Sequence, residues 1–300
     1  MYDLIIVGAG PAGITAAVYA ARKKMDLLVI SGDIGGQAAW SGDIENYTGY
    51  QFITGPELAS KFEEHMHKYG VAVKEAEFVL DLRKIDDRII VKTDKGQYES
   101  KAAIIASGKR SRELSVPGEK EFKNKGLTYC ATCDGPLFAG KDVAVIGGGN
   151  SALDAVLQLM KIARRIYIVN IVSHLTGDPI MIEKARKSDI VTIMNNAKVL
   201  EITGNGMVRA ILVRCDGEEK NLPVEGIFVE IGLIPNSHFA LSIDKNAFGE
   251  IKVDCQNRTN IPGIFAAGDV TDVPEKQIII AAGEGSKASL SVFRYLNQRR

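Results

Sequence analysis

Two cysteines with an acidic neighbour are the residues of this 300-residue chain best suited to chemistry. Cys130 and Cys133 are separated by two residues, and Asp134 follows directly. Thiols at this spacing can close a disulfide in a suitable turn, and one of them usually has a lowered pKa. Such a pair accepts two electrons and passes them on by thiolate attack on another disulfide. Asp134 could transfer the accompanying proton if it lies within reach, so all three are candidate catalytic residues.

The other two cysteines do not extend this site. Cys215 and Cys255 stand apart from the pair and from each other, and we expect both to be small packing residues. Structural zinc usually takes four Cys or His ligands, and only one close pair is present, without a nearby histidine. We therefore expect no metal site. A secreted disulfide-stapled protein would contain more cysteines in a shorter chain.

Composition and charge exclude several other classes of function. The chain has 37 basic and 37 acidic side chains, whereas a nucleic-acid-binding protein would have a basic excess. No apolar run reaches the roughly 18 residues of a membrane helix. Residues 1–25 lack the basic start of a signal peptide. We expect a cytoplasmic protein that binds neither nucleic acid nor membrane.

A glycine-rich turn near the N-terminus predicts a dinucleotide site. The turn Gly8-Ala-Gly-Pro-Ala-Gly13 follows an apolar strand at residues 2–7 and precedes an alanine-rich helix at residues 14–24. A second strand at residues 27–31 completes a βαβ unit, which is the context that the G-x-G-x-x-G pattern requires. The glycines permit a tight turn and close approach of a pyrophosphate, and the helix N-terminus offers free N–H groups.

A second copy of this arrangement lies in the middle of the chain. A strand at residues 142–146 precedes Gly147-Gly-Gly-Asn-Ser-Ala152, which opens a helix to Ala163, and a further strand is expected at residues 166–170. Two such folds indicate two dinucleotides, or one dinucleotide and a relic. A plain tight turn between strand and helix is the remaining interpretation of the second copy.

The elements that position these residues form two similar halves. Each glycine turn is followed by a β-rich stretch, at residues 78–105 and 198–229, with turns at residues 94–96, 204–206 and 216–217. The C-terminus adds residues 263–269 and a helical tail at residues 283–296. Each half is therefore predicted to be a Rossmann unit with an antiparallel insertion, and the joints are placed near residues 112–117 and 241–244.

The cysteine pair also bears on the cofactor. Because thiols exchange electrons poorly with a nicotinamide, a flavin between the nicotinamide and the thiols is chemically sensible.

The sequence resembles the low-molecular-weight thioredoxin reductases and, equally, the flavoprotein reductase part of alkyl hydroperoxide reductase. The matching stretches extend along the whole chain and are highly specific together: residues 8–13, 35–37, 43–47, 104–108, 116–118, 130–135, 147–152, 232–236, 263–269 and 276–280.

The resemblance implies an α/β fold of two Rossmann-like, three-layer ββα dinucleotide-binding domains, one inserted in the other. Residues 1–113 and 244–300 would form the FAD-binding domain, and residues 114–243 the NAD(P)H-type domain with the cysteine pair. It implies that Cys133 lies by the flavin, that Cys130 attacks the partner disulfide and that Asp134 is the acid/base. The implied FAD contacts are Gly8, Gly10, Pro11, Ala12, Gly13, Gly35, Gly36, Gln37, Asn46, Ser107, Gly108, Gly268, Asp269, Lys276, Gln277 and Ile278.

The resemblance also concerns assembly and partners. It implies a homodimer and a large rotation of the inserted domain that alternately presents the nicotinamide and the cysteines to the flavin. Because the chain begins directly at its FAD strand, we expect no N-terminal redox domain, so a separate thioredoxin- or glutaredoxin-like carrier would receive the electrons.

The second nucleotide site departs from the family pattern. Its candidate residues are Gly147, Gly149, Asn150, Ser151, Ala152 and Asn170. NADPH-using relatives follow the strand with His-Arg-Arg and a further Arg, and NADH-using relatives place a Glu at its end; here Asn170 is followed by Ile171-Val-Ser-His174. Three donors remain open: NADH or weak nicotinamide use, reduced ferredoxin or another flavin protein, and NADPH held by unusual contacts.

Three other functions share parts of this pattern. A ferredoxin–NADP-type flavin reductase has the fold but lacks the cysteines, and a dithiol oxidase would pass electrons from thiols to oxygen. A flavin-binding sensor with a regulatory dithiol would show no turnover. The leading hypothesis is an FAD-dependent thioredoxin-disulfide reductase.

Overall fold

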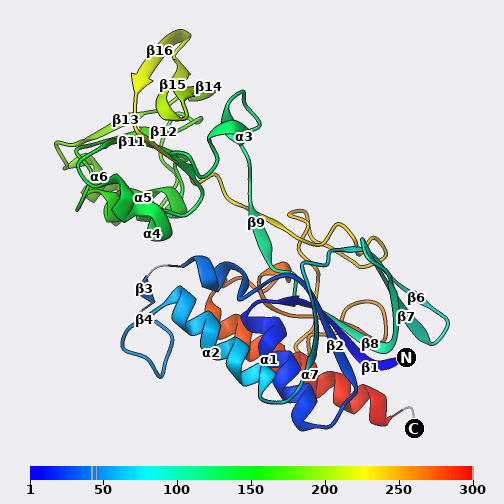
Figure 1. The fold of residues 1–300 in the computed structure, drawn as a ribbon. Helices are drawn as coiled ribbons and strands as arrows, with labels where there is room; N and C mark the ends of the chain where they lie inside the picture. Colours follow the sequence, from blue (N-terminus) through cyan, green and yellow to red (C-terminus); the bar gives the residue numbers. More distant parts are fainter. Residues whose placement is uncertain (42, 45, 299–300) are drawn as a thin grey trace. The chain divides into compact units, whose positions relative to one another are not determined.

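The computed structural model describes residues 1–41, 43–44 and 46–298, and of residues 43, 132 and 133 it describes the backbone only. The chain forms two compact units (Figure 1). Unit 1 comprises Met1–Arg110 and Ile234–Arg300, and unit 2 comprises Ser111–Leu233. Within the described residues, no helix combines the length and apolar character of a membrane span.

Unit 1 is built on a mixed sheet whose strand order is β5-β2-β1-β8-β7-β6, with β19 also paired to β8. The strands β1, β2, β5, β8 and β19 are parallel, and β6 and β7 join them as an antiparallel extension. Their bounds are β1 Tyr2–Ala9, β2 Leu27–Ile34, β5 Ala72–Glu75, β6 Val79–Ile85, β7 Arg88–Thr93, β8 Gln97–Ile105 and β19 Ile264–Ala266.

Both faces of the unit 1 sheet are covered, which explains why its parallel strands are continuous apolar runs. Leu4 and Ile6 pack on one side against the helices α1 (Pro11–Arg22), α2 (Gly55–His67) and α7 (Ile278–Asn297), which lie together on that face in Figure 1. Ile5 and Val7 pack on the other side, beneath β6, β7 and residues 239–243.

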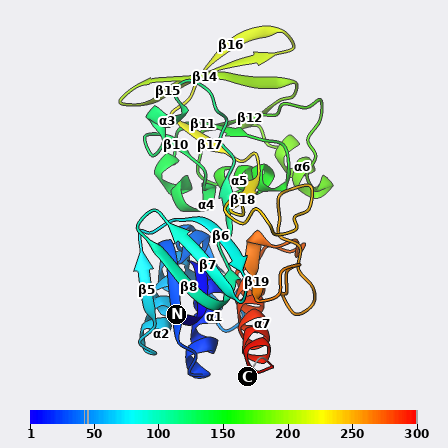
Figure 2. The same ribbon diagram turned by 90° about the vertical axis from the view of Figure 1, so that its right-hand side faces the viewer.

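Unit 2 repeats the three layers (Figure 2). Its parallel sheet has the order β10-β17-β11-β12-β13, and a separate antiparallel sheet has the order β14-β15-β16. One core lies between the two sheets, and another lies between the parallel sheet and the helices. The bounds are β10 Leu127–Thr128, α4 Ala131–Asp134, β11 Asp142–Ile146, α5 Asn150–Leu159, β12 Arg165–Val169, α6 Pro179–Arg186, β13 Val191–Met194, β14 Ala197–Asn205, β15 Met207–Cys215, β16 Glu218–Pro223 and β17 Gly226–Val229.

Short elements complete the chain. They are η1 Gly36–Trp40, β3 Asp43–Ile44, β4 Ile53–Thr54, β9 Lys109–Ser111, α3 Glu119–Phe122, η2 Gly135–Phe138, β18 Leu233–Pro235 and η3 Gly268–Val270. The strands β9 and β18 pair with each other where the chain passes between the units.

The predicted α/β class with two Rossmann-type, three-layer units is confirmed. Several boundaries differ from the sequence expectation, three of them by four residues or more. The helix α5 ends at Leu159 instead of Ala163, because the N–H of Ile162 already turns back to the carbonyl of Leu159. The helix α7 starts five residues before the expected Gly283. The second crossing between units lies before Ile234, not near residue 243, because Phe239, Ala240 and Ile243 pack in the unit 1 core.

Candidate active site

The first glycine turn has the shape of a phosphate cradle. A Cβ at Gly8, whose φ is +105°, would lie 2.3 Å from the carbonyl oxygen of Ala106, and a Cβ at Gly13 would lie 1.8 Å from that of Gly8. A Cβ at Gly10 would meet nothing within 4 Å. Gly8 and Gly13 are thus required by packing, whereas Gly10 leaves an open face. The helix α1 begins there without a side-chain cap, so its first N–H groups can bind an anion.

Three further segments reach the same edge of the sheet, each after the carboxyl end of a parallel strand. Gly36 follows β2, and a Cβ there would lie 3.3 Å from Cα of Gly10. Gly268 follows β19, and a Cβ there would lie 2.9 Å from Cβ of Ala12. Ser107 follows β8, and its hydroxyl donates to the carbonyl of Asn236 at 2.6 Å. Ligands of open α/β sheets bind at this edge.

The start of α7 brings in the remaining predicted contacts. Asn46 Nδ2 donates to Gln277 Oε1 at 3.0 Å, although 231 positions separate them in sequence. Gln277 precedes α7, which also begins without a side-chain cap. Gln37 Nε2 donates to the carbonyl of Lys109 at 3.2 Å. The structure therefore gathers at one edge of unit 1 the sixteen residues predicted to contact FAD: Gly8, Gly10, Pro11, Ala12, Gly13, Gly35, Gly36, Gln37, Asn46, Ser107, Gly108, Gly268, Asp269, Lys276, Gln277 and Ile278.

A charged cluster that the sequence did not indicate supports this edge. Glu250 Oε1 lies 2.7 Å from Nζ of Lys109 and 3.1 Å from Nζ of Lys276. Burial opposes ionisation of Glu250, but hydrogen bonds from both lysines and from Asn246 outweigh it and lower the pKa of Glu250 to about 2. Burial also raises the pKa of Asp269, although the positive charges of Lys276 and Lys109 act to lower it. No sequence signal pairs Lys109 with Glu250, because 141 positions separate them.

The residues of this edge fit a dinucleotide such as FAD. The open face at Gly10, the uncapped N-termini of α1 and α7, and the carboxylate of Asp269 provide donors for phosphates and an acceptor for hydroxyl groups. No side chain of the described residues caps α1 or α7.

In the redox segment of unit 2, Thr128 forms hydrogen bonds with Cys130 and Asp134. The sequence did not indicate Thr128. Cys130 is half-buried and disulfide-bonded, whereas Cys215 and Cys255 are free. Thr128 Oγ1 accepts the N–H of Cys130 at 3.1 Å and donates to Oδ2 of Asp134. The Asp134 carboxylate is thereby held beside the cysteine segment. The side chain of Cys133 lies outside the described residues.

The second glycine turn has the same backbone path but a different environment. Gly147 has a φ of +135°, and a Cβ there would lie 2.2 Å from the carbonyl oxygen of Glu230. A Cβ at Gly148 would lie 2.5 Å from Oδ1 of Asn170. The helix α5 begins after Gly149 without a side-chain cap, and Ala152 is buried in its first turn.

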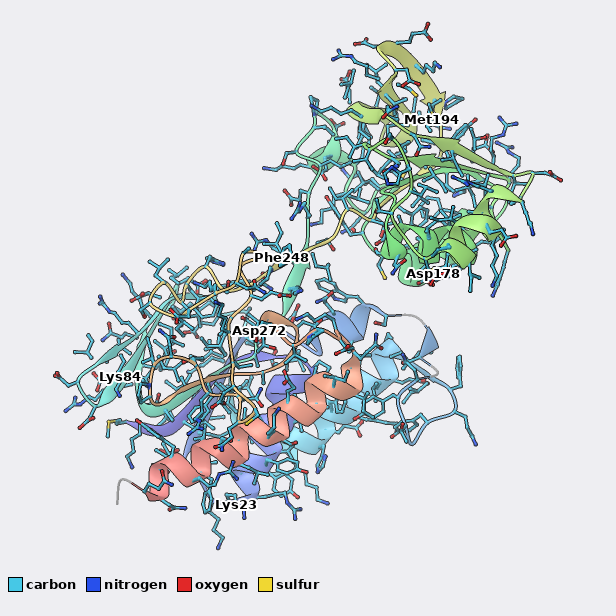
Figure 3. All side chains as sticks on the ribbon, turned by 180° about the vertical axis from the view of Figure 1, so that it is seen from behind. Lys23, Lys84, Asp178, Met194, Phe248 and Asp272 are labelled. Carbon is cyan, nitrogen blue, oxygen red and sulfur yellow. The ribbon has the colours of Figure 1, made fainter. Side chains whose placement is uncertain are left out.

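Groups of the protein itself already bind the polar atoms of this turn. Asn150 Oδ1 accepts the N–H of Asp178 at 2.7 Å, and Figure 3 labels Asp178 at the start of α6. The N–H of Thr176 donates to the carbonyl of Gly148 at 2.7 Å. The Ser151 hydroxyl donates to the Glu230 carboxylate. Glu230 was not expected from the sequence, because only the pairing of β17 with β11 brings it to the turn.

The side chain of Asn170 forms hydrogen bonds with the loop that follows β12. It is 3% exposed, and its Nδ2 donates to the carbonyls of Val172 and His174 at 3.0 and 2.9 Å and to Asn195 Oδ1 at 2.8 Å. These bonds use the amide hydrogens that a ribose would need. Ile171, directly after it, is 67% exposed and carries no charge.

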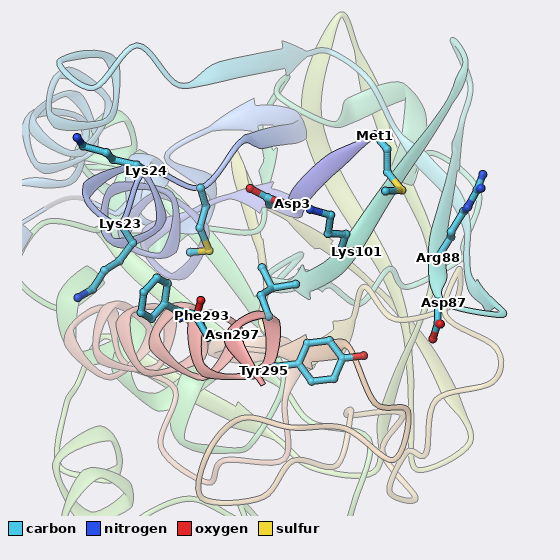
Figure 4. Close-up of a pocket in the computed structure, with 12 residues that line it drawn as sticks. Met1, Asp3, Lys23, Lys24, Asp87, Arg88, Lys101, Phe293, Tyr295 and Asn297 are labelled. Carbon is cyan, nitrogen blue, oxygen red and sulfur yellow. Dashed lines mark hydrogen bonds and ion pairs between the residues drawn. The ribbon is translucent and has the colours of Figure 1, made fainter. Parts of the chain in front are cut away.

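One hollow in the described part of the chain lies away from these residues. A pocket of about 640 Å³ is lined by Met1, Lys24, Lys101 and Phe293 among others (Figure 4), at the start of β1 and the end of α7. It is therefore at the sheet edge opposite the glycine turns. Within the described residues, no three His, Cys, Asp or Glu side chains form a metal site.

The chain matches a protein-family model over most of its length. The model of the pyridine nucleotide-disulphide oxidoreductases matches residues 2–285. A protein named NADH dehydrogenase from Ferdinandcohnia aciditolerans is 42% identical over 299 residues, which are 98% of this chain and 57% of that protein. A Staphylococcus aureus protein that carries the name alkyl hydroperoxide reductase is also 42% identical, over 98% of this chain and 59% of its own length. The chain thus spans under three fifths of these relatives.

Solved structures match over their full length. Thioredoxin reductase of Lactococcus lactis, in the FR conformation, has a TM-score of 0.86 and 34% identity over 99% of this chain and 100% of its own. That of T. acidophilum has a TM-score of 0.83 and 36% identity over 100% and 99%. A ferredoxin-flavin thioredoxin reductase of Clostridium acetobutylicum has a TM-score of 0.55 and 29% identity over 99% and 98%. These similarities confirm the resemblance predicted from the sequence.

Proposed function

Because the chain belongs to the pyridine nucleotide-disulphide oxidoreductase family, we propose that it is an FAD-dependent disulfide reductase whose substrate is a thioredoxin- or glutaredoxin-like protein. The observation that supports this most directly is the disulfide-bonded Cys130, with the carboxylate of Asp134 fixed beside its segment by Thr128. The full-length similarity to structures named thioredoxin reductases supports the same choice.

The edge of unit 1 would hold FAD, which when bound supplies two-electron transfer between a donor and a disulfide. The open face at Gly10 and the N–H groups of α1 would bind its pyrophosphate. The carboxylate of Asp269 would accept a hydroxyl group, and Asn46 and Gln277 would contact the cofactor together. The ion cluster of Lys109, Glu250 and Lys276 would keep this edge in place.

In the proposed reaction, two electrons and one proton convert the Cys130–Cys133 disulfide to a thiolate and a thiol. The Cys130 thiolate attacks the partner disulfide, so a mixed disulfide forms and one partner sulfur leaves as a thiolate. Asp134 takes the proton of Cys133 and gives it to the leaving thiolate. Cys133 then attacks the sulfur of Cys130, which restores the internal disulfide and releases the reduced partner.

For the electron donor we propose NADH in preference to NADPH. The loop of residues 171–178 contains no lysine or arginine, so a 2′-phosphate would lose charge-assisted hydrogen bonds of about 1.5–3 kcal/mol each. The name of the relative from Ferdinandcohnia aciditolerans agrees with NADH. A reduced ferredoxin is the second candidate, because the amide hydrogens of Asn170 are already used within the chain.

Anaerobic titration of the flavin absorbance tests the donor and the redox couple. The holoenzyme is titrated in turn with NADH, NADPH, reduced ferredoxin and dithiothreitol. Bleaching by NADH supports the first proposal, and bleaching by ferredoxin and dithiothreitol without NADH supports the second. If dithiothreitol bleaches the flavin of a Cys130→Ser variant as it does the native flavin, the proposed electron path through the disulfide is wrong.

A homodimer and a rotation of unit 2 are part of the same proposal. Light scattering of the purified holoenzyme measures the dimer directly, and a mass of 32.5 kDa, that of a single chain, would contradict it.

A further inference from the structure

The carboxylate of Glu230 lies at the start of α5. The Ser151 hydroxyl, in the first turn of that helix, donates to Oε2 of Glu230. The position is fixed by the sheet, because β17 pairs with β11 and the N–H of Glu230 donates to the carbonyl of Ile146 at 2.8 Å. The same residue closes one side of the turn, since its carbonyl oxygen leaves no room for a Cβ at Gly147.

This carboxylate also contacts the redox segment. It accepts the backbone N–H of Ala131, the residue that follows the disulfide-bonded Cys130 and begins α4. One side chain therefore connects the start of α4 with the start of α5. The proposed nucleotide site and the proposed redox centre meet at Glu230 within unit 2.

The charge of Glu230 is unfavourable for a dinucleotide. The N-terminus of a helix attracts an anion, and here the anion is already supplied by the protein. Burial raises the pKa of Glu230, and the negative charge of Asp154 raises it further. A pyrophosphate brought to α5 would therefore meet a carboxylate that already lies at the helix N-terminus.

We propose that Glu230 is the specificity-determining residue of the second site, and that a nicotinamide dinucleotide binds there only by displacing its carboxylate from Ser151. Displacement also releases the N–H of Ala131, so occupation of the site is linked to the backbone beside Cys130. The inference rests on the proposed function, because it assumes that α5 is where a dinucleotide donor binds.

The test measures binding of ADP-ribose to the FAD-loaded enzyme by calorimetry. ADP-ribose contains the pyrophosphate but cannot reduce a flavin. Glu230→Gln keeps an oxygen that accepts from Ser151 and Ala131 and removes the charge. We expect it to bind ADP-ribose at least about tenfold more tightly than the native enzyme, because juxtaposed like charges are costly. Glu230→Asp keeps the charge and should remain weak.

The matched control is Asp154→Asn. It removes one negative charge from α5 but leaves the contact of Glu230 with Ser151, and Asp154 has its own partner in Gln158 at 2.9 Å. Its affinity for ADP-ribose should stay within about twofold of the native value, as for other exposed charges. The flavin spectrum and the thermal melting curve show whether each variant is folded, and Glu230→Ala replaces the glutamine variant if that one fails to fold.

The inference is overturned if the folded charge-removing variant at position 230 binds ADP-ribose no better than the native enzyme, or if Asp154→Asn tightens binding equally. Failure of the proposed function is seen separately. If dithiothreitol does not reduce the flavin of the native enzyme, the disulfide reductase assignment is wrong whatever the affinity of the Glu230 variants.

Discussion

The two glycine turns have the same topology and opposite surroundings. At the first turn, a Cβ at Gly10 would meet nothing within 4 Å, and the N–H groups of α1 are open. At the second turn, the amide of Asn170 fills the space beside Gly148 and the carboxylate of Glu230 binds Ser151. A glycine motif therefore predicts a backbone path, whereas the neighbouring segments decide whether a ligand can enter.

The largest effect is expected from two alanine substitutions in the first turn. In Gly13→Ala the new Cβ would lie 1.8 Å from the carbonyl oxygen of Gly8, so we expect a loss of about 3 kcal/mol or more in the free energy of unfolding. Gly10→Ala has room and a φ of −80° that alanine adopts, so it should keep the fold and lose FAD. Thermal melting and the flavin content per chain separate the two. If both variants lose the same stability and the same amount of flavin, the distinct roles of Gly10 and Gly13 are contradicted.

A substitution beside the second turn should lower the free energy of unfolding and leave the flavin content per chain unchanged. Asn170→Ala removes the printed donor to the carbonyl of His174 and one of two donors to the carbonyl of Val172, which also accepts the N–H of Asn196. We expect a cost of about 1–3 kcal/mol in the free energy of unfolding. Denaturant unfolding measures the loss, with the flavin absorbance as a probe of unit 1. Loss of FAD in this variant would show that the two turns are not independent. Ser173→Ala, in the same loop, is the matched control and should change little.

Cations placed in the second site should restore part of a 2′-phosphate site. Ile171→Arg with Val172→Arg adds charge at two exposed positions, and we expect about tenfold tighter binding of 2′-phospho-ADP-ribose, from one charge-assisted hydrogen bond. Binding of ADP-ribose itself should hardly change. Equal gains for both ligands would indicate general electrostatic attraction and not a phosphate site.

The smallest expected effect is an opposite pH dependence of the two units. The pKa of Glu250 is lowered to about 2, so its stabilising contribution is complete above about pH 4.5 and is lost as the pH falls from there toward 2. Burial raises the pKa of Glu230 in the folded chain. The contribution of Glu230 to the free energy of unfolding is therefore most favourable below about pH 4.5, and it is lost as the pH rises through the raised pKa. Lys109 and Lys276 face the first carboxylate, and Asp154 lies near the second.

Denaturant unfolding at several pH values, comparing the native chain with Glu250→Gln and Glu230→Gln, measures both slopes. The stability gap between native and Glu250→Gln should shrink on acidification, and the gap for Glu230→Gln should change in the other direction. If both stability gaps change in the same direction with pH, the proposed electrostatic difference between the two turns is wrong.

Local patterns predicted most of the fold. The apolar strands, both glycine turns and the hairpin turns at residues 94–96 and 204–206 are fixed by neighbours in sequence, and they were predicted correctly. The helix α7 begins at Ile278 and not at the expected Gly283, so both Gly283 and Gly285 lie inside the helix. In the structure Gly285 allows α7 to approach α1, since a Cβ there would lie 2.0 Å from the carbonyl oxygen of Ala12.

The parts that the sequence did not predict depend on contacts between distant segments. Glu230 reaches the second turn through the order of strands in the sheet, and Glu250 meets Lys109 across 141 positions. Each is an ordinary charged residue in its local sequence. Thr128 is close to Cys130, but a single threonine before a cysteine pair has no distinctive pattern.

The paired strands β9 and β18 hold the two crossings of the chain side by side. The N–H of Asn236 donates to the carbonyl of Gly108, and the N–H of Arg112 to that of Gly232, each at 2.9 Å. The chain therefore leaves unit 1 and returns to it at neighbouring points. Excising residues 111–233 would leave two ends that a short turn of about two to five residues could join, so the sheet of unit 1 would keep all its strand connections without unit 2.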